Sequence, residues 1–367
     1  PAYPLDYQRG FIKGCFDGLN NIKSNSLEGA KKTNETAKHR CVALCLETRP
    51  DYCKQEHINH MLEYGTTRVE IGVQTLDDKV HETTNRGHTT QDSIEATQLL
   101  KDSCFKVGYH MMIGLPGSTP KKDLDMFKKL FSDQRFQPDQ LKIYPTFVIR
   151  GTLLEEKYEK GELVPYTTEQ IVDTIVQIKR VVPRYVRIMR VMRDIPAQYI
   201  VSSCRYSHLR DSIRERLREL GLNCKCIRCR EVGHALRRGT RPENIELCRT
   251  DYDASNGKEI FLSFEDREKD IIVSLLRLRL PYKPFRKELE GAAFIREIHT
   301  FGPQTRIGEE GGFWQHRGLG RKLMEEAERI AREQGFRKMA VIAGVGVREY
   351  FYKLGYRPDG PYVSKAL

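Results

Sequence analysis

VGYHMMIGLPG, residues 107–117, is an apolar run that ends in a glycine-rich turn, a pattern typical of a buried strand and the loop after it. Three other runs are similarly apolar and β-branched: CVALCLE (41–47), RVEIGVQ (68–74) and LKIYPTFVI (141–149). Helix-like stretches lie between them: QEHINHMLEYG (55–65), QDSIEATQLLKD (91–102) and KKDLDMFKKLF (121–131). This alternation predicts an α/β fold with a parallel sheet, in a barrel or a doubly wound arrangement.

In both arrangements the functional site lies at the carboxyl ends of the parallel strands. The residues at these ends are Glu47, Gln74, the Gly114–Ser118 turn and Arg150. We therefore expect a binding or catalytic site to include them.

Positive charge is concentrated in two neighbouring segments of the chain. The formal net charge is +12; residues 179–193 contain six Lys or Arg and no carboxylate, and residues 201–240 contain ten Lys or Arg against four Asp or Glu. A scattered excess would indicate only a solvated cationic face. Concentrated charge favours a polyanion partner, RNA or DNA, because phosphate neutralisation releases counterions.

Composition also bears on the cell compartment. No apolar run has the length needed to span a bilayer, so no membrane partner is expected. Ten cysteines without a secretory leader at Pro1 predict a reducing, cytoplasmic environment, where thiols stay free or bind metal.

The strand and helix alternation ends near residue 195. HLRDSIRERLRELG (208–221) predicts an Arg-rich helix, and CKCIRC (224–229) follows it. Cys224, Cys226 and Cys229 can converge on one tetrahedral zinc ion, with His208 as the preferred fourth ligand. Cys204, His234 and Cys248 are the other candidates, and three free thiols are the alternative to a metal. Cys41, Cys45 and Cys53 are interpreted as buried thiols, because residues four apart in one strand lie too far apart for a compact iron–sulfur cluster.

The last part of the chain combines strands with a helix that starts in QHRGLGRKL (315–323). Its expected strands are EIFLSFED (259–266), DIIVSLLRLRLP (270–281), AAFIREIHTFG (292–302) and KMAVIAG (338–344). Glycines at a helix start let an anion approach the free N–H groups, so Arg317, Gly318, Gly320 and Arg321 suit a pyrophosphate. A simple tight turn is the alternative.

This order of elements resembles the GNAT acetyltransferase family, whose phosphate loop reads Q/R-x-x-G-x-G/A. Gln315, Gly318 and Gly320 match its fixed positions, and His316 falls inside the loop. The resemblance implies that the loop holds the pyrophosphate of acetyl-CoA. It also implies that a tyrosine of the next helix lies near the thioester sulfur and protonates the departing thiolate. Tyr350 has that place by order and Tyr352 is the alternative; plain core aromatics would be the simpler explanation.

Longer stretches resemble the catalytic subunits of Elongator, in an archaeal-type form. They are LETRPDYC (46–53), VEIGVQTLDDKV (69–80), NRGHT (85–89), GYHMMIGLPGST (108–119), LKIYPTFVIRGT (141–152), RVMRDIPA (190–197), CIRCREVG (226–233), QHRGLGRKL and GVREYF (346–351). The resemblance runs over essentially the whole chain, in order. It implies an incomplete radical SAM (β/α) barrel over 1–195, a basic zinc-binding linker over 196–240 and a GNAT domain over 241–367.

The resemblance further implies an enzyme that acts on tRNA. Acetyl-CoA would be bound and hydrolysed when tRNA is present, for carboxymethylation at carbon 5 of the wobble uridine in the anticodon stem-loop. Glu47, Gln74, the Gly114–Gly117 turn, and Lys142 or Tyr144 would line the cleft for S-adenosylmethionine and the uridine. Tyr350, Glu47 and Lys142 are thus the expected catalytic residues, and the basic segments would hold the tRNA.

Other expectations concern the limits of the chain and its partners. The family's CxxxCxxC motif should precede PAYPLDY (1–7), which is expected inside a strand, so a 4Fe–4S cluster is expected in the full-length protein only. A homodimer or accessory subunits are possible assemblies. The alternative functions are a protein lysine acetyltransferase of the histone type and a non-catalytic RNA-binding scaffold.

Overall fold

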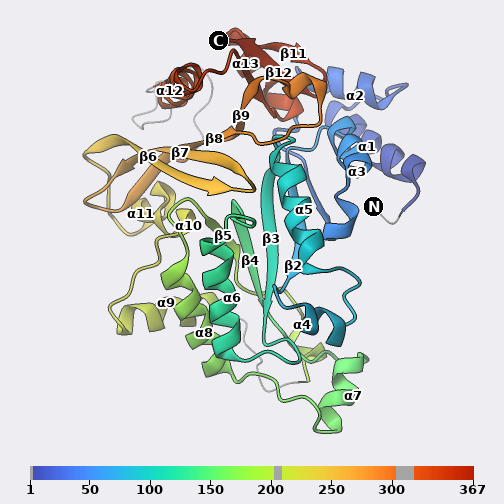
Figure 1. The fold of residues 1–367 in the computed structure, drawn as a ribbon, viewed down its shortest axis with the longest axis vertical. Coiled ribbons are helices and arrows are strands. Elements are labelled where there is room, and N and C mark those ends of the chain that lie inside the picture. Colours follow the sequence, from blue (N-terminus) through green and yellow to red (C-terminus); the bar gives the residue numbers. More distant parts are fainter. Residues whose placement is uncertain (1–2, 202–208, 303–317) are drawn as a thin grey trace. The chain divides into compact units, whose positions relative to one another are not determined.

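The structure is a computed structural model that describes residues 3–201, 209–302 and 318–367 (Figure 1). The chain divides into two compact units. The first consists of residues 1–70, 95–107 and 231–367, and the second consists of residues 71–94 and 108–230. Neither unit is therefore a continuous stretch of sequence.

Five strands of the N-terminal half form one sheet in the order β1-β2-β3-β4-β5. They are β1 (Cys45–Thr48), β2 (Arg68–Gln74), β3 (Lys106–Ile113), β4 (Gln140–Pro145) and β5 (Arg187–Arg190). The pairs β3–β4 and β4–β5 are parallel. The α/β prediction is confirmed.

Eight helices of the described residues belong to this half. They are α1 (Leu5–Asn20), α2 (Leu27–Asn34), α3 (Gln55–Glu63), α4 (Asp78–Thr83), α5 (Thr90–Lys101), α6 (Pro120–Ser132), α7 (Leu153–Glu159) and α8 (Thr168–Val181). α6 begins where Thr119 accepts a hydrogen bond from the N–H of Lys122, with Pro120 at its first position. Among the described residues, no helix combines the length and the apolar character that a membrane crossing requires.

Two expectations for the start of the chain are wrong. PAYPLDY was expected in a strand, but α1 begins at Leu5, about two turns before its buried face of Ile12 and Phe16. The run CVALCLE is a strand only from Cys45, and Cys41 lies outside it. The reason is that apolar residues 41–44 are partly covered by packing rather than by strand pairing: Cys41 and Leu44 lie against the cluster of Ile12, Phe16, Ala30, Tyr64 and Val345.

A seven-stranded sheet forms the C-terminal part, in the order β11-β12-β10-β9-β8-β7-β6. Its strands are β6 (Ile245–Ala254), β7 (Gly257–Asp266), β8 (Ile271–Leu280), β9 (Ala292–Thr300), β10 (Lys338–Val341), β11 (Arg357–Asp359) and β12 (Tyr362–Ala366). Within the described residues, β9 and β10 pair in parallel, and the other neighbouring strands of this sheet are antiparallel. Two helices accompany it, α12 (Leu319–Glu333) and α13 (Arg348–Lys353).

One face of this sheet packs on α12. Leu323, Ala327 and Ile330 of α12 lie in one core cluster with Leu276 and Leu278 of β8. Because side chains alternate along a strand, Arg277 and Arg279 leave β8 on the other face. Both arginines are nevertheless buried, and so are Glu259 of β7 and Arg296 of β9.

Segment 95–107 supplies a charged partner to two of these residues, Arg279 and Glu259. Arg279 binds Asp102 at 2.6 Å, and Lys101 lies 3.3 Å from Glu259. Glu259 also accepts hydrogen bonds from Arg279 at 3.0 Å and from Arg296 at 2.6 Å. We call Lys101, Asp102, Glu259, Arg279 and Arg296 the buried ion cluster. It connects the end of α5 to the C-terminal sheet inside the first unit.

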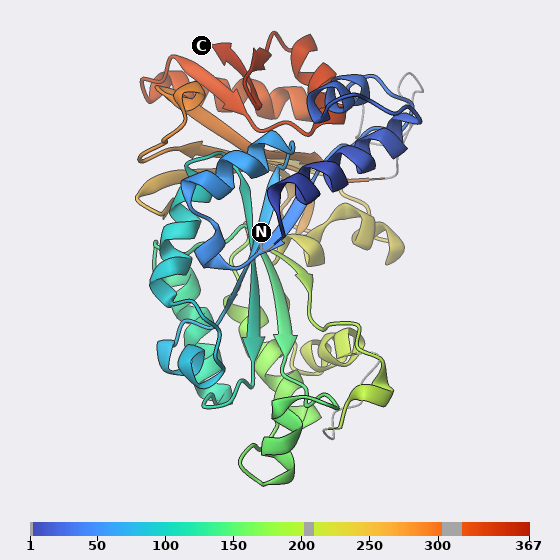
Figure 2. The ribbon, with the colours of Figure 1, turned by 90° about the vertical axis from the view of Figure 1, so that its right-hand side faces the viewer.

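Along the chain, the segment between β5 and β6 contains α9 (Leu209–Glu219), α10 (Ile227–Arg230) and α11 (Val232–Arg237). The expected Arg-rich helix is present as α9, and its apolar residues Leu209, Ile213 and Leu217 are buried. In the first unit, α1 and α2 lie beside the C-terminal strands and α13 (Figure 2). N-terminal and C-terminal segments therefore share one apolar cluster.

Candidate functional site

Within the described residues, no side-chain hydrogen bond caps the start of α12, and we call it the open helix start. Gly318 is its N-cap residue in the left-handed conformation, with φ 71°, and makes no side-chain capping hydrogen bond. The N–H groups of the first turn point away from the helix body and favour an anion. Gln315, His316 and Arg317, which we expected beside this turn, lie outside the described residues.

Tyr350 of α13 reaches this helix start. A Cβ atom placed on Gly320 would lie 3.0 Å from the Tyr350 hydroxyl, so glycine at this position admits the phenol. Burial raises the pKa of Tyr350, and nearby Arg321 acts in the opposite direction. The phenol therefore stays protonated at neutral pH and can donate a proton.

The two tyrosines proposed for this site lie in different places. Tyr350 is 40% exposed beside Gly320, whereas the Tyr352 hydroxyl lies 3.5 Å from a carboxylate oxygen of Glu35. Arg321 extends from the first turn of α12, where its Nε lies 3.0 Å from Glu325. Of the two, only Tyr350 is at the open helix start.

The parallel strands beside this helix separate along their length. β9 and β10 pair from Ala292 to Ile295, opposite Lys338 to Val341. β9 then continues to Thr300 next to β8. The carboxyl half of β9 therefore has no pairing with β10. This is the end of β9 that precedes α12 along the chain.

The Gly114–Ser118 turn follows β3 and is held by a buried carboxylate. Asp123 accepts hydrogen bonds from the Gly114 N–H at 2.8 Å, the Ser118 hydroxyl at 2.5 Å and the Tyr166 hydroxyl at 2.8 Å. Burial raises the pKa of Asp123, while these three donors lower it. Asp123 and Tyr166 were not predicted from the sequence, because no local pattern shows that Tyr166 packs on Gly114.

The other expected residues of the strand ends are placed as follows. Gln74 ends β2 with φ 65° and is 9% exposed. Lys142 lies on β4, opposite His110 of β3 in the parallel register. The Tyr144 ring is edge-on to His110 at 5.5 Å between centroids, and Arg193 lies 6.0 Å from its face.

Glu47 lies on β1, in the first unit. It lines a largely apolar cavity of about 210 Å³ together with residues of α1 and α3, namely Leu5, Phe11, His57, His60, Met61 and Tyr64. Arg150 follows β4, where its N–H donates to the Tyr199 carbonyl at 2.9 Å.

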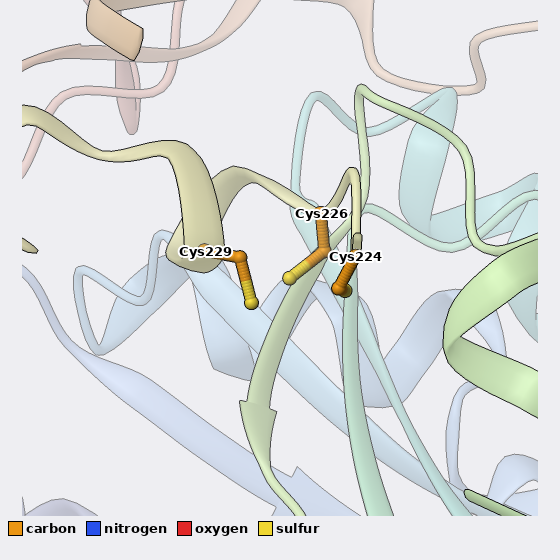
Figure 3. Close-up of side chains that lie close together, drawn as sticks. All are labelled: Cys224, Cys226 and Cys229. Carbon is orange, nitrogen blue, oxygen red and sulfur yellow. The ribbon is translucent and has the colours of Figure 1, made fainter. Parts of the chain in front are cut away.

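The three linker cysteines come together (Figure 3). Their sulfur atoms lie within 4.8 Å of one another in the second unit. Hydrogen bonds from Cys224 and Cys229 lower the pKa of the Cys226 thiol against the effect of burial. Because the thiolate is the metal-binding form, this cluster fits a zinc ion.

Lys179 of α8 is a neighbour that the sequence did not reveal. Its ammonium lies 3.7 Å from the Cys229 sulfur. Burial opposes its charge, but the three thiols outweigh burial and raise the pKa of Lys179. A fixed cation beside three cysteines offsets the negative charge that thiolates bring to a metal site.

The fourth ligand stays a prediction. His208 and Cys204 lie outside the described residues. His234 is 3.1 Å from Glu231, and Cys248 lies on β6 near the Glu246 carbonyl. In the part of the chain that the structure describes, Cys41, Cys45 and Cys53 form no three-ligand group, so they do not fit an iron–sulfur cluster.

Three protein families match successive parts of the chain. The Radical SAM superfamily matches residues 19–130, the Radical SAM C-terminal domain matches residues 138–219, and the GNAT acetyltransferase family matches residues 242–356. The tRNA uridine(34) acetyltransferase of Methanocaldococcus jannaschii is 50% identical over 374 residues, which cover 100% of this chain and 69% of that protein. The chain belongs to the tRNA uridine(34) acetyltransferase and Elongator complex protein 3 family.

The family includes eukaryotic members. Elongator complex protein 3 of Homo sapiens is 43% identical over 371 residues, which cover 100% of this chain and 68% of that protein. The structure of the archaeal Methanocaldococcus infernus Elp3 with an N-terminal deletion superimposes with a TM-score of 0.96 at 50% identity, covering 100% of this chain and 88% of that one.

Membership establishes the enzyme class and the two chemistries. The chain is an enzyme of the acyltransferase class with a radical SAM region and a GNAT region. The radical SAM match implies S-adenosylmethionine and a 4Fe–4S cluster, and the GNAT match implies acetyl-CoA. The predicted boundaries at 195 and 240 remain predictions.

Proposed function

We propose that this family member acts on carbon 5 of the wobble uridine in the tRNA anticodon stem-loop, and that it binds and hydrolyses acetyl-CoA when tRNA is present. Similarity to the archaeal tRNA uridine(34) acetyltransferases supports the tRNA substrate. The observation that carries the acetyl-CoA step is the Tyr350 hydroxyl lying against Gly320 at the open start of α12. The cytoplasm, where tRNA is modified, is the compartment that we infer.

The residues present fit acetyl-CoA at this helix start. When bound, acetyl-CoA supplies a thioester. The free N–H groups that follow Gly318 would hold its diphosphate, with Arg321 as an added cation. Gln315, His316 and Arg317 belong to the same proposed cradle.

Tyr350 has the proposed role of general acid. Burial keeps its hydroxyl proton in place at neutral pH, because it raises the pKa of the phenol. The phenol can therefore transfer its proton to the thiolate sulfur as the carbon–sulfur bond breaks, which prevents the build-up of negative charge. Tyr352 is the weaker candidate, since its hydroxyl lies near Glu35.

The radical SAM region holds the second proposed site. We assign Gln74 and the Gly114–Gly117 turn to S-adenosylmethionine, Glu47 and Lys142 to the reaction, and Tyr144 to the uridine. The hydrogen bonds of Asp123 keep the turn in one conformation, which suits a binding loop. The described cysteines do not fit a 4Fe–4S cluster, so we derive no radical step.

The tRNA would contact the basic segments, yet not all of their arginines are available. Arg216 of α9 lies 2.9 Å from Asp173 and 3.4 Å from both Glu169 and Glu219. Arg218, two residues later, is exposed and forms no ion pair within the described residues. We therefore assign phosphate contact to Arg218 and a structural role to Arg216.

For the linker we propose one structural zinc ion, held by Cys224, Cys226 and Cys229 with His208 as the fourth ligand. The convergence of three sulfur atoms supports it. A zinc ion supplies cross-linking here rather than chemistry, since three cysteines and a histidine would leave no open coordination position.

The test is acetyl-CoA hydrolysis by the purified chain under three conditions: alone, with tRNA that carries a wobble uridine, and with a lysine-containing peptide. We expect stimulation by tRNA only. Stimulation by the peptide only would establish a protein lysine acetyltransferase, and binding without hydrolysis under all conditions would support an RNA-binding scaffold.

A further inference from the structure

We propose that residues 35–43, which we call the strap, position α13 so that Tyr350 meets the first turn of α12. The strap leaves the end of α2 and leads to β1. The residues of the strap are positioning residues, because they contact α13 and the residues just before it, and not the proposed acetyl-CoA site. This inference rests on the role proposed for Tyr350 and adds an element that controls it.

The strap approaches the backbone before α13 too closely for any side chain. A Cβ atom on Gly344 would lie 2.0 Å from the Val42 carbonyl oxygen, and one on Gly346 would lie 2.5 Å from the Arg40 Cβ. The Gly346 N–H donates to the Cys41 carbonyl at 2.8 Å. Two glycines thus form a seat for the strap immediately ahead of the helix.

An ion pair fastens the strap to the helix itself. Arg348, the first residue of α13, lies 3.2 Å from Glu35, and their side chains are only 12% and 8% exposed. The Tyr352 hydroxyl approaches the same carboxylate at 3.5 Å. Arg40 and Glu349 form a weaker contact at 3.7 Å.

Helix geometry explains why these contacts control Tyr350. Arg348 and Tyr352 are four residues apart and share the strap side of α13. Tyr350 lies two residues from each, roughly 200° around the axis from Arg348, and so points to the opposite side. The contacts with Glu35 therefore fix the rotation of the helix about its axis, and with it the direction of the phenol.

A small rotation would matter for the reaction. A turn of about 10° moves a tyrosine hydroxyl by roughly 1.5 Å, because that atom lies far from the helix axis. Displacements of about 1 Å can lower a rate by roughly 100-fold. Phe351 is 3% exposed in the core and holds α13 from the core side, so the strap contacts act on the helix together with this packing.

The first experiment uses Glu35→Gln, which keeps the side-chain shape and removes the charge. Glu28→Gln, at an exposed position of α2, is the matched control. We expect Glu35→Gln to lower kcat for tRNA-stimulated acetyl-CoA hydrolysis roughly tenfold, with KM for acetyl-CoA unchanged within about twofold. Glu28→Gln should match the parent protein.

A double-mutant comparison separates positioning from general destabilisation. In a Tyr350→Phe background, the strap has no hydroxyl to position, so Glu35→Gln should cause no further loss of kcat. An equal loss in both backgrounds would overturn the proposal, and so would an unchanged kcat in the parent background.

A spectroscopic readout makes the inference independent of activity. With 3-fluorotyrosine at position 350, the 19F resonance should shift or broaden in Glu35→Gln and in Gly344→Ala, whose Cβ displaces the strap. It should stay in place in Glu28→Gln. An unmoved resonance in both strap variants would disprove positioning, whatever the enzymatic rate. The proposed function would be refuted by a parent protein without tRNA-stimulated hydrolysis, or by a Tyr350→Phe variant that is still active. In either case the 19F resonance still decides whether the strap positions Tyr350.

Discussion

Tyr350 is a phenol whose environment suits the donation of a proton and not its removal. Burial raises its pKa, and glycine at position 320 gives the hydroxyl space at the helix start. A phenol that keeps its proton at this location is suited to protonate a leaving group that develops negative charge.

Tyr350→Phe tests the role of the hydroxyl alone. It should lower the rate of tRNA-stimulated acetyl-CoA hydrolysis by about 100-fold or more, the typical contribution of general acid catalysis. The affinity for acetyl-CoA should stay within about twofold, since the proposed diphosphate contacts lie on α12. Steady-state kinetics and calorimetric binding measure the two quantities; an unaltered rate would remove Tyr350 from the mechanism.

His81 makes the second unit sensitive to acid. Its ring is 4.6 Å from that of His88, and it is only 3% exposed. Burial, followed by the effect of His88, lowers the pKa of His81 in the fold. The unfolded chain then binds the proton more readily, so stability is lost as pH falls below about 6.5, the pKa of an exposed histidine.

We therefore expect the free energy of unfolding to decrease between pH 7 and pH 5. One such histidine contributes a slope of up to about 1.4 kcal/mol per pH unit. His81→Leu should reduce this slope, as measured by urea unfolding at several pH values. An identical slope in the variant would show that other groups control the acid response.

The residues predicted correctly from sequence and those missed differ in how far apart their partners lie. The three cysteines converge because they lie within six positions of one another, which spacing alone can indicate. Asp123 and Tyr166 are 43 positions apart, and Glu35 and Arg348 are 313 apart. No local pattern reveals such pairs, because the fold creates them.

At the scale of the element, the segment that carries the three cysteines has little helical structure of its own. α10 spans only Ile227–Arg230, too short to be stable by itself. A metal ion would supply the missing cross-link.

The zinc content of the protein tests the cysteine cluster. Purified protein should contain about one zinc ion per chain, and Cys226→Ser should lower both the zinc content and the unfolding temperature. Cys15→Ser, at an exposed position of α1, is the control that should retain the metal. Equal zinc content in both variants would exclude the cysteine cluster as the site.

The arginines of α9 allow a matched test of the tRNA surface. Arg218→Ala should weaken tRNA binding and reduce the dependence of log affinity on log salt by about one unit. Arg216→Ala should leave that slope unchanged, because three carboxylates surround its guanidinium. Fluorescence anisotropy across a salt series measures both, and equal slopes for the two variants would contradict the assignment.

Strands were easier to predict than their ends. RVEIGVQ coincides with β2 from Arg68 to Gln74, and every residue after Arg68 is buried, as in a strand covered on both faces. β1, by contrast, starts only at Cys45 and not at residue 41 as predicted. Cys41 and Leu44 pack beside Val345 instead of pairing with a strand. Such boundaries depend on distant partners and not on the run itself.

At the scale of the whole molecule, the sequence predicted three consecutive regions. The structure instead has two compact units, and each consists of separate stretches of sequence. The first unit joins residues 1–70 and 95–107 with residues 231–367. One reason is the buried ion cluster, in which Glu259 of β7 and Arg279 of β8 pair with Lys101 and Asp102 of segment 95–107. Charged residues within an apolar strand show that a polar partner is needed, but not which segment provides it.

Glu259→Gln tests how strongly this unit depends on the cluster. Glu259 has Lys101, Arg279 and Arg296 as neighbours, so its neutralisation leaves buried cations uncompensated. The free energy of unfolding should fall by about 3–5 kcal/mol. Glu246→Gln, an exposed position on β6, should change it by less than about 0.5 kcal/mol. Chemical denaturation measures both, and similar values for the two would contradict the prediction.

The buried ion cluster also has a consequence for biosynthesis. Asp102 emerges from the ribosome 177 residues before its partner Arg279. At about 5–20 residues per second, it waits roughly 10–35 s for that partner. During this interval the nascent N-terminal half exposes surfaces that only the last third of the chain covers. A ribosome that stalls before β8 would therefore release a chain with unsatisfied charges and exposed apolar segments, a typical substrate for chaperones.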